Sequence, residues 1–219
     1  MTTLEFRERL ARRTRRAKAP ITLAMLEPLE TYYRLLAQWN AKINLTALPL
    51  DAPTDETFDR LLVEPLAAAR QVHDAPIIWF DLGSGGGSPA IPLKIARPGL
   101  KLTMVESKTR KGAFLREAIR TLGLTNTVVA EERFEELAGR DDSQGSGHLV
   151  TVRAVRADAA LFEAAAQLLG DGGRLLHFRP SHDPSPDPPG FVSALTVQLT
   201  DAPPAFLSIY KRVFHVERQ

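Results

Sequence analysis

The sequence predicts an α/β fold in which helices cover a mostly parallel sheet. From residue 76 onward, short apolar runs alternate with segments of helical periodicity, a glycine cluster follows the first run, and two adjacent strand-like runs come last. Alternation of this kind is typical of β-α-β units in a parallel sheet. We expect a helical extension over residues 1–75 and a Rossmann-like domain over residues 76–219.

The extension is expected to contain three helices. Residues 4–18 are strongly charged, and Pro20 separates them from residues 22–39, in which leucines and aromatic residues recur at helical spacing. A third helix is expected from Phe58 to about Val72.

The predicted sheet has seven strands. Residues 192–199 and 205–213 are expected to be two final strands with no helix between them. Such a hairpin at the end of a parallel sheet distinguishes the class I methyltransferase architecture from that of Rossmann dehydrogenases. The polar residues 141–148 and the proline-rich residues 183–190 are expected to be loops. The five earlier strands are expected at 77–82, 100–106, 125–131, 148–154 and 173–178, and the helices between them at 89–96, 108–122 and 158–169.

The composition is that of an ordinary globular protein. Of the 219 residues, 44% are hydrophobic and 25% are charged, and no stretch approaches the roughly 18 apolar residues of a membrane span. The N-terminus lacks the apolar segment of a secretory signal, and the absence of cysteine excludes disulfides and thiolate chemistry. We therefore expect a cytoplasmic monomer without membrane contact. No metal site is expected, because metal-ligand spacing is missing among His73, His148, His177, His182 and His215.

Positive charge is concentrated in two segments, although the formal net charge is only +2. Such clusters either follow a nucleic-acid backbone or are solvated helix faces, and the sequence leaves both interpretations open. The first cluster comprises Arg7, Arg9, Arg12, Arg13, Arg15, Arg16 and Lys18, and the second comprises Lys108, Arg110, Lys111, Arg116 and Arg120.

A glycine-rich loop directly follows the first predicted strand. It reads Asp-Leu-Gly-Ser-Gly-Gly-Gly-Ser over residues 81–88, and glycines such as Gly83 and Gly85 allow a sharp turn and a close approach to a ligand. Glu106 ends the next predicted strand, where an acid accepts hydrogen bonds from both hydroxyls of a ribose. Together these features predict a cofactor that contains adenosine.

Details of the loop favour S-adenosylmethionine over a dinucleotide. Gly85 to Ala90 fit the Gly-x-Gly-x-x-Ala variant of the dinucleotide pattern. However, Pro89 lies at a position where that pattern expects a regular, closely packed helix. Asp81 would repel a pyrophosphate and attract the ammonium group of a methionine tail. The alternatives are a nicotinamide or flavin nucleotide, and hence an oxidoreductase, or a domain whose glycines only form a turn.

The segment from residue 80 to residue 124 contains a series of short motifs. They read Asp81, Gly83, Gly85, Gly87, Pro89-Ala90-Ile91-Pro92-Leu93, Glu106-Ser107, Arg110-Lys111 and Phe114-Leu115. With these motifs the segment resembles the RsmG family, also called glucose-inhibited division protein B, and the resemblance extends over about residues 29–180. Further motifs are similar at WNAKINLTAL (39–48), RFEE (133–136) and VRA (152–154). The sequence departs from the family pattern at Ala90, where Gly is usual, at Leu61, where His is usual, and at Arg179-Pro180, where Lys-Gly is usual.

The resemblance implies a class I S-adenosylmethionine-dependent methyltransferase with an N-terminal helical extension. It implies methyl transfer to N7 of a guanine in the 530 loop of 16S rRNA, with 16S rRNA or the small ribosomal subunit as the partner. Substrate contacts are expected from Arg110, Lys111 and Arg179, and Arg153 is the expected catalytic residue. The cofactor contacts carried over by position are Gly83, Ser88, Phe134, Glu135 and Arg153, which join Asp81, Gly85 and Glu106 from the argument on the loop.

This reaction needs no general base. Guanine N7 carries a lone pair and no proton, so the protein has to hold N7, the methyl carbon and the sulfur in line, while the cofactor brings the reactive group. A catalytic His or Cys is therefore not required. The departures from the family pattern leave open a non-catalytic RNA-binding or ribosome-binding protein on the same fold.

Overall fold

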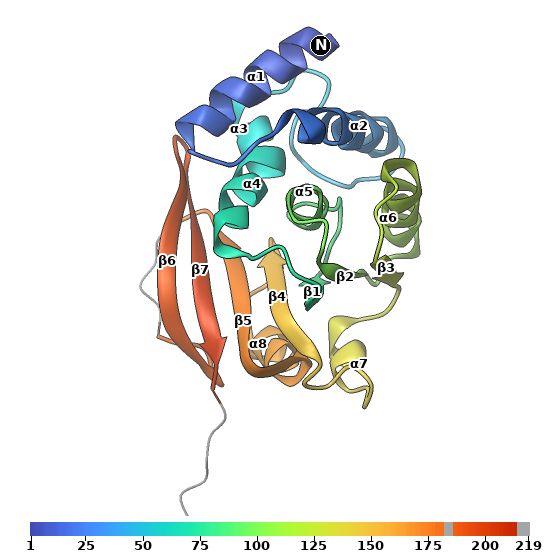
Figure 1. Cartoon of the computed structure of the whole chain (residues 1–219). Helices are drawn as coiled ribbons and strands as arrows, with labels where there is room; N and C mark the ends of the chain where they lie inside the picture. Colours follow the sequence, from blue (N-terminus) through green and yellow to red (C-terminus); the bar gives the residue numbers. More distant parts are fainter. Residues whose placement is uncertain (182–185, 214–219) are drawn as a thin grey trace, which may run out of the picture.

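A seven-stranded sheet forms the centre of the computed structural model, which describes residues 1–181 and 186–213 (Figure 1). The strand order is β3-β2-β1-β4-β5-β7-β6. Strands β1 to β5 pair in parallel, whereas β7 runs antiparallel to β5 and β6. The predicted class I sheet with its terminal hairpin is confirmed. The strands are β1 (Ile78–Leu82), β2 (Lys101–Val105), β3 (Thr127–Ala130), β4 (Gly147–Arg153), β5 (Leu169–Arg179), β6 (Phe191–Asp201) and β7 (Pro204–Arg212).

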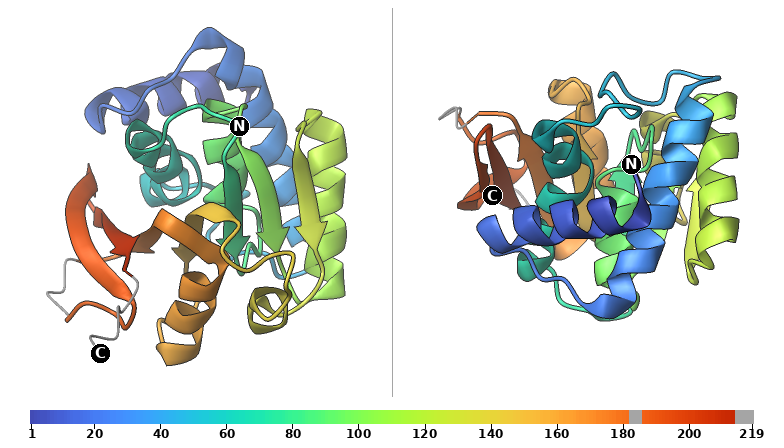
Figure 2. Two further views of the ribbon diagram at one scale, coloured as in Figure 1. Left: turned by 60° about the horizontal axis from the view of Figure 1, so that its bottom comes forward. Right: turned by 90° about the horizontal axis from the view of Figure 1, so that it is seen from above.

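Helices cover both faces of this sheet. On one face, α5 (Ala90–Ala96) and α6 (Thr109–Leu122) share a hydrophobic cluster with the N-terminal helices. On the other face, α7 (Phe134–Ala138) and α8 (Ala159–Leu168) pack on a second cluster. The two groups of helices lie on opposite sides of the strands (Figures 1 and 2).

Side-chain alternation brings three polar residues to the same face. In β1, Trp79 packs in the cluster on the α5 side and Phe80 in the cluster on the α8 side, so Asp81 faces the α5 side. By the same alternation, Glu106, directly after β2, and Arg153, at the end of β4, face that side too. All three stand at the carboxyl ends of parallel strands, where ligands bind in open α/β sheets.

The N-terminal extension is helical, as the sequence predicts, but its third helix is interrupted. A capping box of Thr2 and Glu5 starts the first helix. The interruption precedes Pro65, which has no backbone N–H to donate to the preceding turn. In order, the segments are α1 (Thr3–Arg16), α2 (Leu23–Asn40), α3 (Asp55–Phe58), a π-helical turn (Asp59–Val63), α4 (Glu64–Ala68) and a 3₁₀ turn (Ala69–Gln71).

Two other boundaries differ from the sequence prediction. The fifth strand starts at Leu169, where it pairs with Gly147, so the glycines expected to precede it lie within it. The polar segment 141–148 consists of turns, except that Gly147 and His148 begin β4. Residues 183–185 of the expected proline-rich loop lie outside the described residues. Within the described ranges, no helix has both the length and the apolarity needed to cross a membrane.

A histidine in β5 is expected to make the fold sensitive to acid. Burial, helped by the charge of Arg179, lowers the pKa of His177 from 6.5 to about 4. The unfolded chain therefore binds the proton first, and stability is lost as the pH falls from 6.5 toward 4. We expect His177→Gln to remove roughly 1 kcal/mol of the stability difference between pH 7 and pH 5, after allowance for partial solvent exposure. Urea unfolding of wild type and His177→Gln at both pH values measures the change. If the stability difference between pH 7 and pH 5 is the same in both proteins, this role of His177 is contradicted.

Candidate functional site

The glycine loop is tied to the end of the neighbouring strand. The backbone N–H groups of Gly83 and Ser84 both donate to the Val105 carbonyl, at 2.9 and 3.0 Å. Gly83 has φ +72°, and a Cβ built there would lie 2.5 Å from a methyl carbon of Val155. Only glycine satisfies both conditions without strain. The loop therefore has a defined conformation before any ligand binds.

The acid after β2 lies beside this loop. The Glu106 carboxylate accepts hydrogen bonds from the backbone N–H groups of Gly85 and Lys108, each at 2.9 Å. Its side chain is buried, and these two bonds orient it at the carboxyl end of the sheet. Each oxygen keeps a further lone pair, so the carboxylate can still accept bonds from ribose hydroxyls.

The acid at the end of β1 has an unpartnered oxygen. The Trp79 indole N–H donates to the Thr151 hydroxyl, which in turn donates to Oδ1 of Asp81. Oδ2 of Asp81 is buried and accepts no hydrogen bond. Burial raises the pKa of Asp81 to about 6. A buried carboxylate oxygen without a donor is costly unless a ligand supplies one, and an ammonium group would do so.

A cavity of about 550 Å³ opens next to the loop, within the usual range for small-molecule sites. Four parts of the chain surround it: the glycine loop, the ends of β4 and β5, the start of α6, and the N-terminal extension. Its volume and its mixed lining suit a cofactor together with a reacting group. It is lined by Leu36, Leu45, Thr46, Ala47, Leu48, Arg60, Leu61, Gly83, Ser84, Gly85, Gly86, Ser88, Lys111, Arg153, Ala154, Phe178 and Pro180.

The N-terminal extension forms one wall of this cavity, which the sequence did not predict. The Tyr32 hydroxyl in α2 donates to the Gly86 carbonyl at 2.7 Å. The Asn40 side-chain oxygen accepts the backbone N–H groups of Leu45 and Thr46, at 2.8 and 2.9 Å, and so shapes the segment that lines the cavity. The motif WNAKINLTAL is the sequence signal for this wall, but its family resemblance alone does not indicate a cavity.

Arg153 stands at the cavity wall in a cage of acceptors. One of its terminal nitrogens donates to the Arg60 carbonyl and lies 3.3 Å from the Ser88 hydroxyl, and the other donates to the Glu64 carboxylate. Its guanidinium lies over the Phe178 ring, 5.5 Å from the centroid. The sequence singled out Arg153 but did not indicate these partners.

The remaining site residues predicted from the sequence are divided between the cavity and other places. Lys111 lines the cavity, whereas Arg110 is exposed one residue earlier on α6. Arg179 ends β5 beside the lining residue Pro180, and is not itself a lining residue. Phe134 and Glu135 begin α7; Phe134 packs against the cluster on the α8 side, and neither residue lines the cavity.

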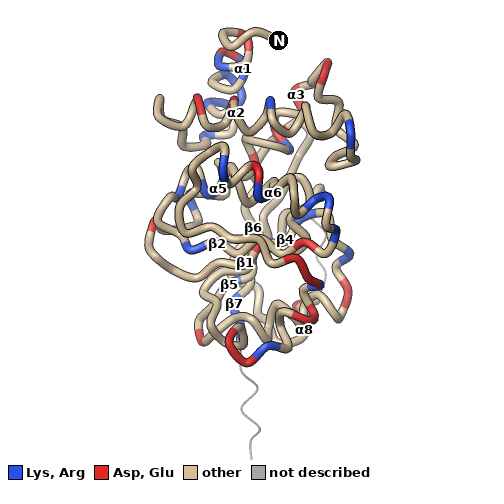
Figure 3. The backbone as a smooth tube through the Cα atoms, turned by 90° about the vertical axis from the view of Figure 1, so that its right-hand side faces the viewer, with Lys and Arg blue, Asp and Glu red and all other residues tan. Residues whose placement is uncertain are grey.

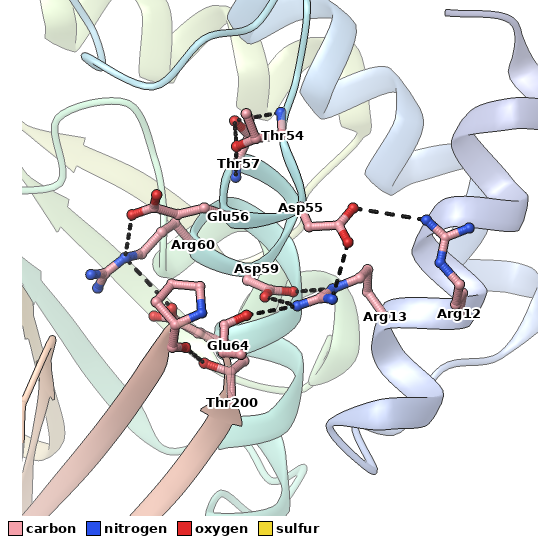
Figure 4. A network of polar contacts seen from close by, with 12 residues as sticks. Arg12, Arg13, Thr54, Asp55, Glu56, Thr57, Asp59, Arg60, Glu64 and Thr200 are labelled. Carbon is pink, nitrogen blue, oxygen red and sulfur yellow. Dashed lines mark hydrogen bonds and ion pairs between the residues drawn. The ribbon is translucent and has the colours of Figure 1, made fainter.

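Four of the seven cations of the first basic cluster pair with acidic residues of the same chain. Arg13 is buried and binds Asp59 with both ends of its guanidinium, and it also pairs with Asp55 at 3.2 Å (Figure 4). Arg7, Arg9 and Arg12 also form ion pairs, with Glu30 or Asp55. These contacts favour the interpretation of this part as a structural helix face. Arg15, Arg16 and Lys18 remain exposed.

The second basic cluster is divided in the same way. Arg116 pairs with Glu131 and Arg120 pairs with Glu117, both at 2.6 Å. Lys108 and Arg110 are exposed at the start of α6, close in sequence to the cavity residue Lys111. Basic and acidic residues are interspersed on this side of the molecule (Figure 3). Within this cluster, the cations nearest the cavity are therefore those at the start of α6.

No group of three or more metal-ligating side chains is found among residues 1–181 and 186–213. Two of the histidines considered above, at positions 182 and 215, lie outside these ranges.

Comparisons with known proteins agree with this geometry. A family model described as "GidB: rRNA small subunit methyltransferase G" matches residues 25–185. A relative from Stenotrophomonas maltophilia strain K279a, named "Ribosomal RNA small subunit methyltransferase G", is 40% identical over 162 residues, which are 73% of this chain and 71% of the relative. A relative of the same name from Chloroflexus aggregans is 38% identical over 157 residues, which are 72% of this chain and 65% of the relative.

A solved structure gives the fold independently. An S-adenosylmethionine-dependent methyltransferase from Aquifex aeolicus superposes with a TM-score of 0.56 and 12% identity, covering 81% of this chain and 98% of that chain. The sheet order and these matches exclude the oxidoreductase alternative. The chain belongs to the rRNA small subunit methyltransferase G family, and its cofactor is S-adenosylmethionine.

Proposed function

We propose that this protein transfers a methyl group from S-adenosylmethionine to N7 of a guanine in the 530 loop of 16S rRNA. The observation that carries the proposal is the position of two buried acids, Asp81 and Glu106, around the glycine loop of a cavity that has two cations, Arg153 and Lys111, in its wall. The acids suit a ribose and an ammonium, and the cations suit a carboxylate and a nucleic-acid phosphate.

The cofactor contacts are proposed from this arrangement. Glu106 accepts the ribose hydroxyls, Gly83 and Gly85 let the backbone approach the cofactor, and Asp81 Oδ2 accepts the methionine ammonium. Arg153 donates to the methionine carboxylate, and Ser88 supports Arg153 at 3.3 Å. By family position, Phe134 and Glu135, which follow β3, also contact the cofactor. When bound, the cofactor supplies an electrophilic methyl group.

The protein's part in the reaction is to hold the guanine in place and to exclude water. Guanine N7 needs no deprotonation, so the site has to orient the base and keep water away. Leu36, Leu45 and Phe178 supply apolar walls for this purpose. A base in an RNA loop is more easily displaced into such a cavity than a base in a duplex. Lys111 in the cavity wall, and Arg110 and Arg179 next to lining residues in sequence, contact the phosphates in this proposal.

Substitution of Lys111 tests the RNA contact. We expect Lys111→Gln to raise the KM for the RNA substrate and to lower the salt dependence of RNA binding by about one phosphate contact, because one cation is removed. Affinity for S-adenosylhomocysteine should stay unchanged. Arg120→Gln removes a positive charge from an exposed position on the same helix. It should change neither the KM for the RNA nor the salt dependence of RNA binding. Equal salt slopes for wild type and Lys111→Gln would contradict the assignment.

The function itself is tested by methylation of small ribosomal subunits that lack the mark. Purified protein and labelled cofactor should modify one guanine of the 530 loop, and mass spectrometry of the digested RNA should find one 7-methylguanosine. Naked 16S rRNA, assayed in parallel, shows whether the assembled particle is required. Binding of S-adenosylhomocysteine without methyl transfer to either RNA would favour the second candidate, a non-catalytic RNA-binding or ribosome-binding protein, which the departures at Leu61 and Arg179 keep open.

A further inference from the structure

The interrupted helix beside the cavity deprives two backbone carbonyls of their α-helical donors. In an α-helix the Arg60 carbonyl would accept from Glu64, but the Glu64 N–H bonds to Asp59, five residues back. In a π-helix the Arg60 carbonyl would accept from residue 65, which is Pro65 and has no N–H. The Leu61 carbonyl loses its α-helical donor for the same reason. These carbonyls are therefore available to other donors.

Both carbonyls accept hydrogen bonds from residues at the proposed cofactor site. The Ser88 hydroxyl lies within hydrogen-bonding distance of the carbonyls of Leu61, at 3.0 Å, and Arg60, at 3.3 Å. The Arg153 guanidinium also donates to the Arg60 carbonyl, and its other end donates to Glu64, whose side chain is 2% exposed. One helical turn thus presents a carbonyl and a carboxylate to the same arginine.

The helical turn itself is held from its other side. Asp59 binds Arg13 of α1, and Arg60 lies between Glu56 and Glu64, 3.8 Å from each carboxylate (Figure 4). An arginine that is ordered before the ligand arrives loses less side-chain entropy on binding. Rigid support of this kind is what a binding residue requires to keep a productive geometry.

We propose that Glu64 and Pro65 are positioning residues for the cofactor. Pro65 frees the Arg60 and Leu61 carbonyls, Glu64 supplies the charge, and together they orient Arg153 over Phe178 toward the cavity. The inference rests on the proposed contact between Arg153 and the cofactor's carboxylate. Neither residue touches the cofactor, and both act through Arg153.

The test is calorimetric titration of the full chain with S-adenosylhomocysteine, with melting temperatures recorded for every variant. We expect Glu64→Gln to weaken binding about tenfold, the loss that corresponds to one charge-assisted hydrogen bond. In an Arg153→Met background the same substitution should change the affinity less than about twofold, because residues that act through one another are not additive. Glu56→Gln, which removes a partner of the same Arg60 from an exposed position, should bind like wild type.

Pro65→Ala provides an independent variant that keeps every side-chain charge. It restores a backbone N–H that competes for the freed carbonyls, so we expect weaker cofactor binding without a lower melting temperature. Wild-type affinity in Glu64→Gln, or the same tenfold loss with and without Arg153, would overturn the role of Glu64. Wild-type affinity in Pro65→Ala would overturn the role of Pro65. Wild-type affinity in Arg153→Met would instead remove the proposed cofactor contact itself.

Discussion

Asp81→Asn is expected to stabilise the free protein and to weaken cofactor binding about 100-fold, as removal of one partner from a buried charge pair does. The carboxylate is buried with one unpartnered oxygen. Because its pKa is raised from 3.8 to about 6, its favourable contribution to stability is complete below pH 3.8 and is lost as the pH rises through 6. At pH 7 the cost of the ionised group is up to about 3 kcal/mol, which the neutral amide avoids.

The same group makes cofactor binding depend on pH. Asp81 has to be ionised to accept the ammonium, so affinity for S-adenosylhomocysteine should fall as the pH drops below about 6. In Asp81→Asn this part of the pH dependence should disappear. Thermal unfolding at pH 7, together with titrations between pH 5 and pH 8, measures both effects. A variant that is less stable than wild type and keeps the same pH profile would contradict this role for Asp81.

Gly83→Ala is expected to lower cofactor affinity by about 100-fold, because the backbone that approaches the cofactor has to move. Two effects act together. A Cβ at φ +72° is strained, and it would lie 2.5 Å from the Val155 methyl carbon, so the loop or Val155 has to move. The loop carries the backbone that approaches the cofactor, so any displacement is transmitted to the site.

Gly123→Ala is a matched control for the backbone strain alone. Gly123 ends α6 with φ +60°, and a Cβ there would meet no atom within 4 Å. We expect this variant to lose about 1 kcal/mol of stability, and to bind S-adenosylhomocysteine like wild type. Val155→Ala in the Gly83→Ala background should restore part of the affinity by removing the clash. If Gly83→Ala and Gly123→Ala bind the cofactor equally well, the close approach at Gly83 has no functional role.

Most of the fold can be predicted from the sequence because it depends on local patterns. The apolar runs that form β1 and β2 and the turn residues after them are contiguous, so the strand–loop–helix unit around residues 81–88 is readable directly. The sequence predicts the third helix but not its interruption, because the apolar spacing continues across Pro65. Periodicity reports which face is buried, and does not report which backbone donors are missing.

The site is less predictable because its walls come from distant segments. Asp81 and Glu106 were found since both follow strands that end at the same edge of the sheet. The partners of Arg153 are 89 and 93 residues away in sequence, at Glu64 and at the Arg60 carbonyl, and no local pattern indicates them. Charge clustering also gave an incomplete picture, because Arg13 has a buried acidic partner 46 residues away.

The most direct test of the central claim is a crystal structure of this protein with S-adenosylhomocysteine. We expect the ribose hydroxyls to bind Glu106, the ammonium to lie against Oδ2 of Asp81, and the carboxylate to face Arg153. The sulfur should point into the cavity beside Leu45 and Phe178. A ligand bound elsewhere, or an ammonium turned away from Asp81, would contradict the account.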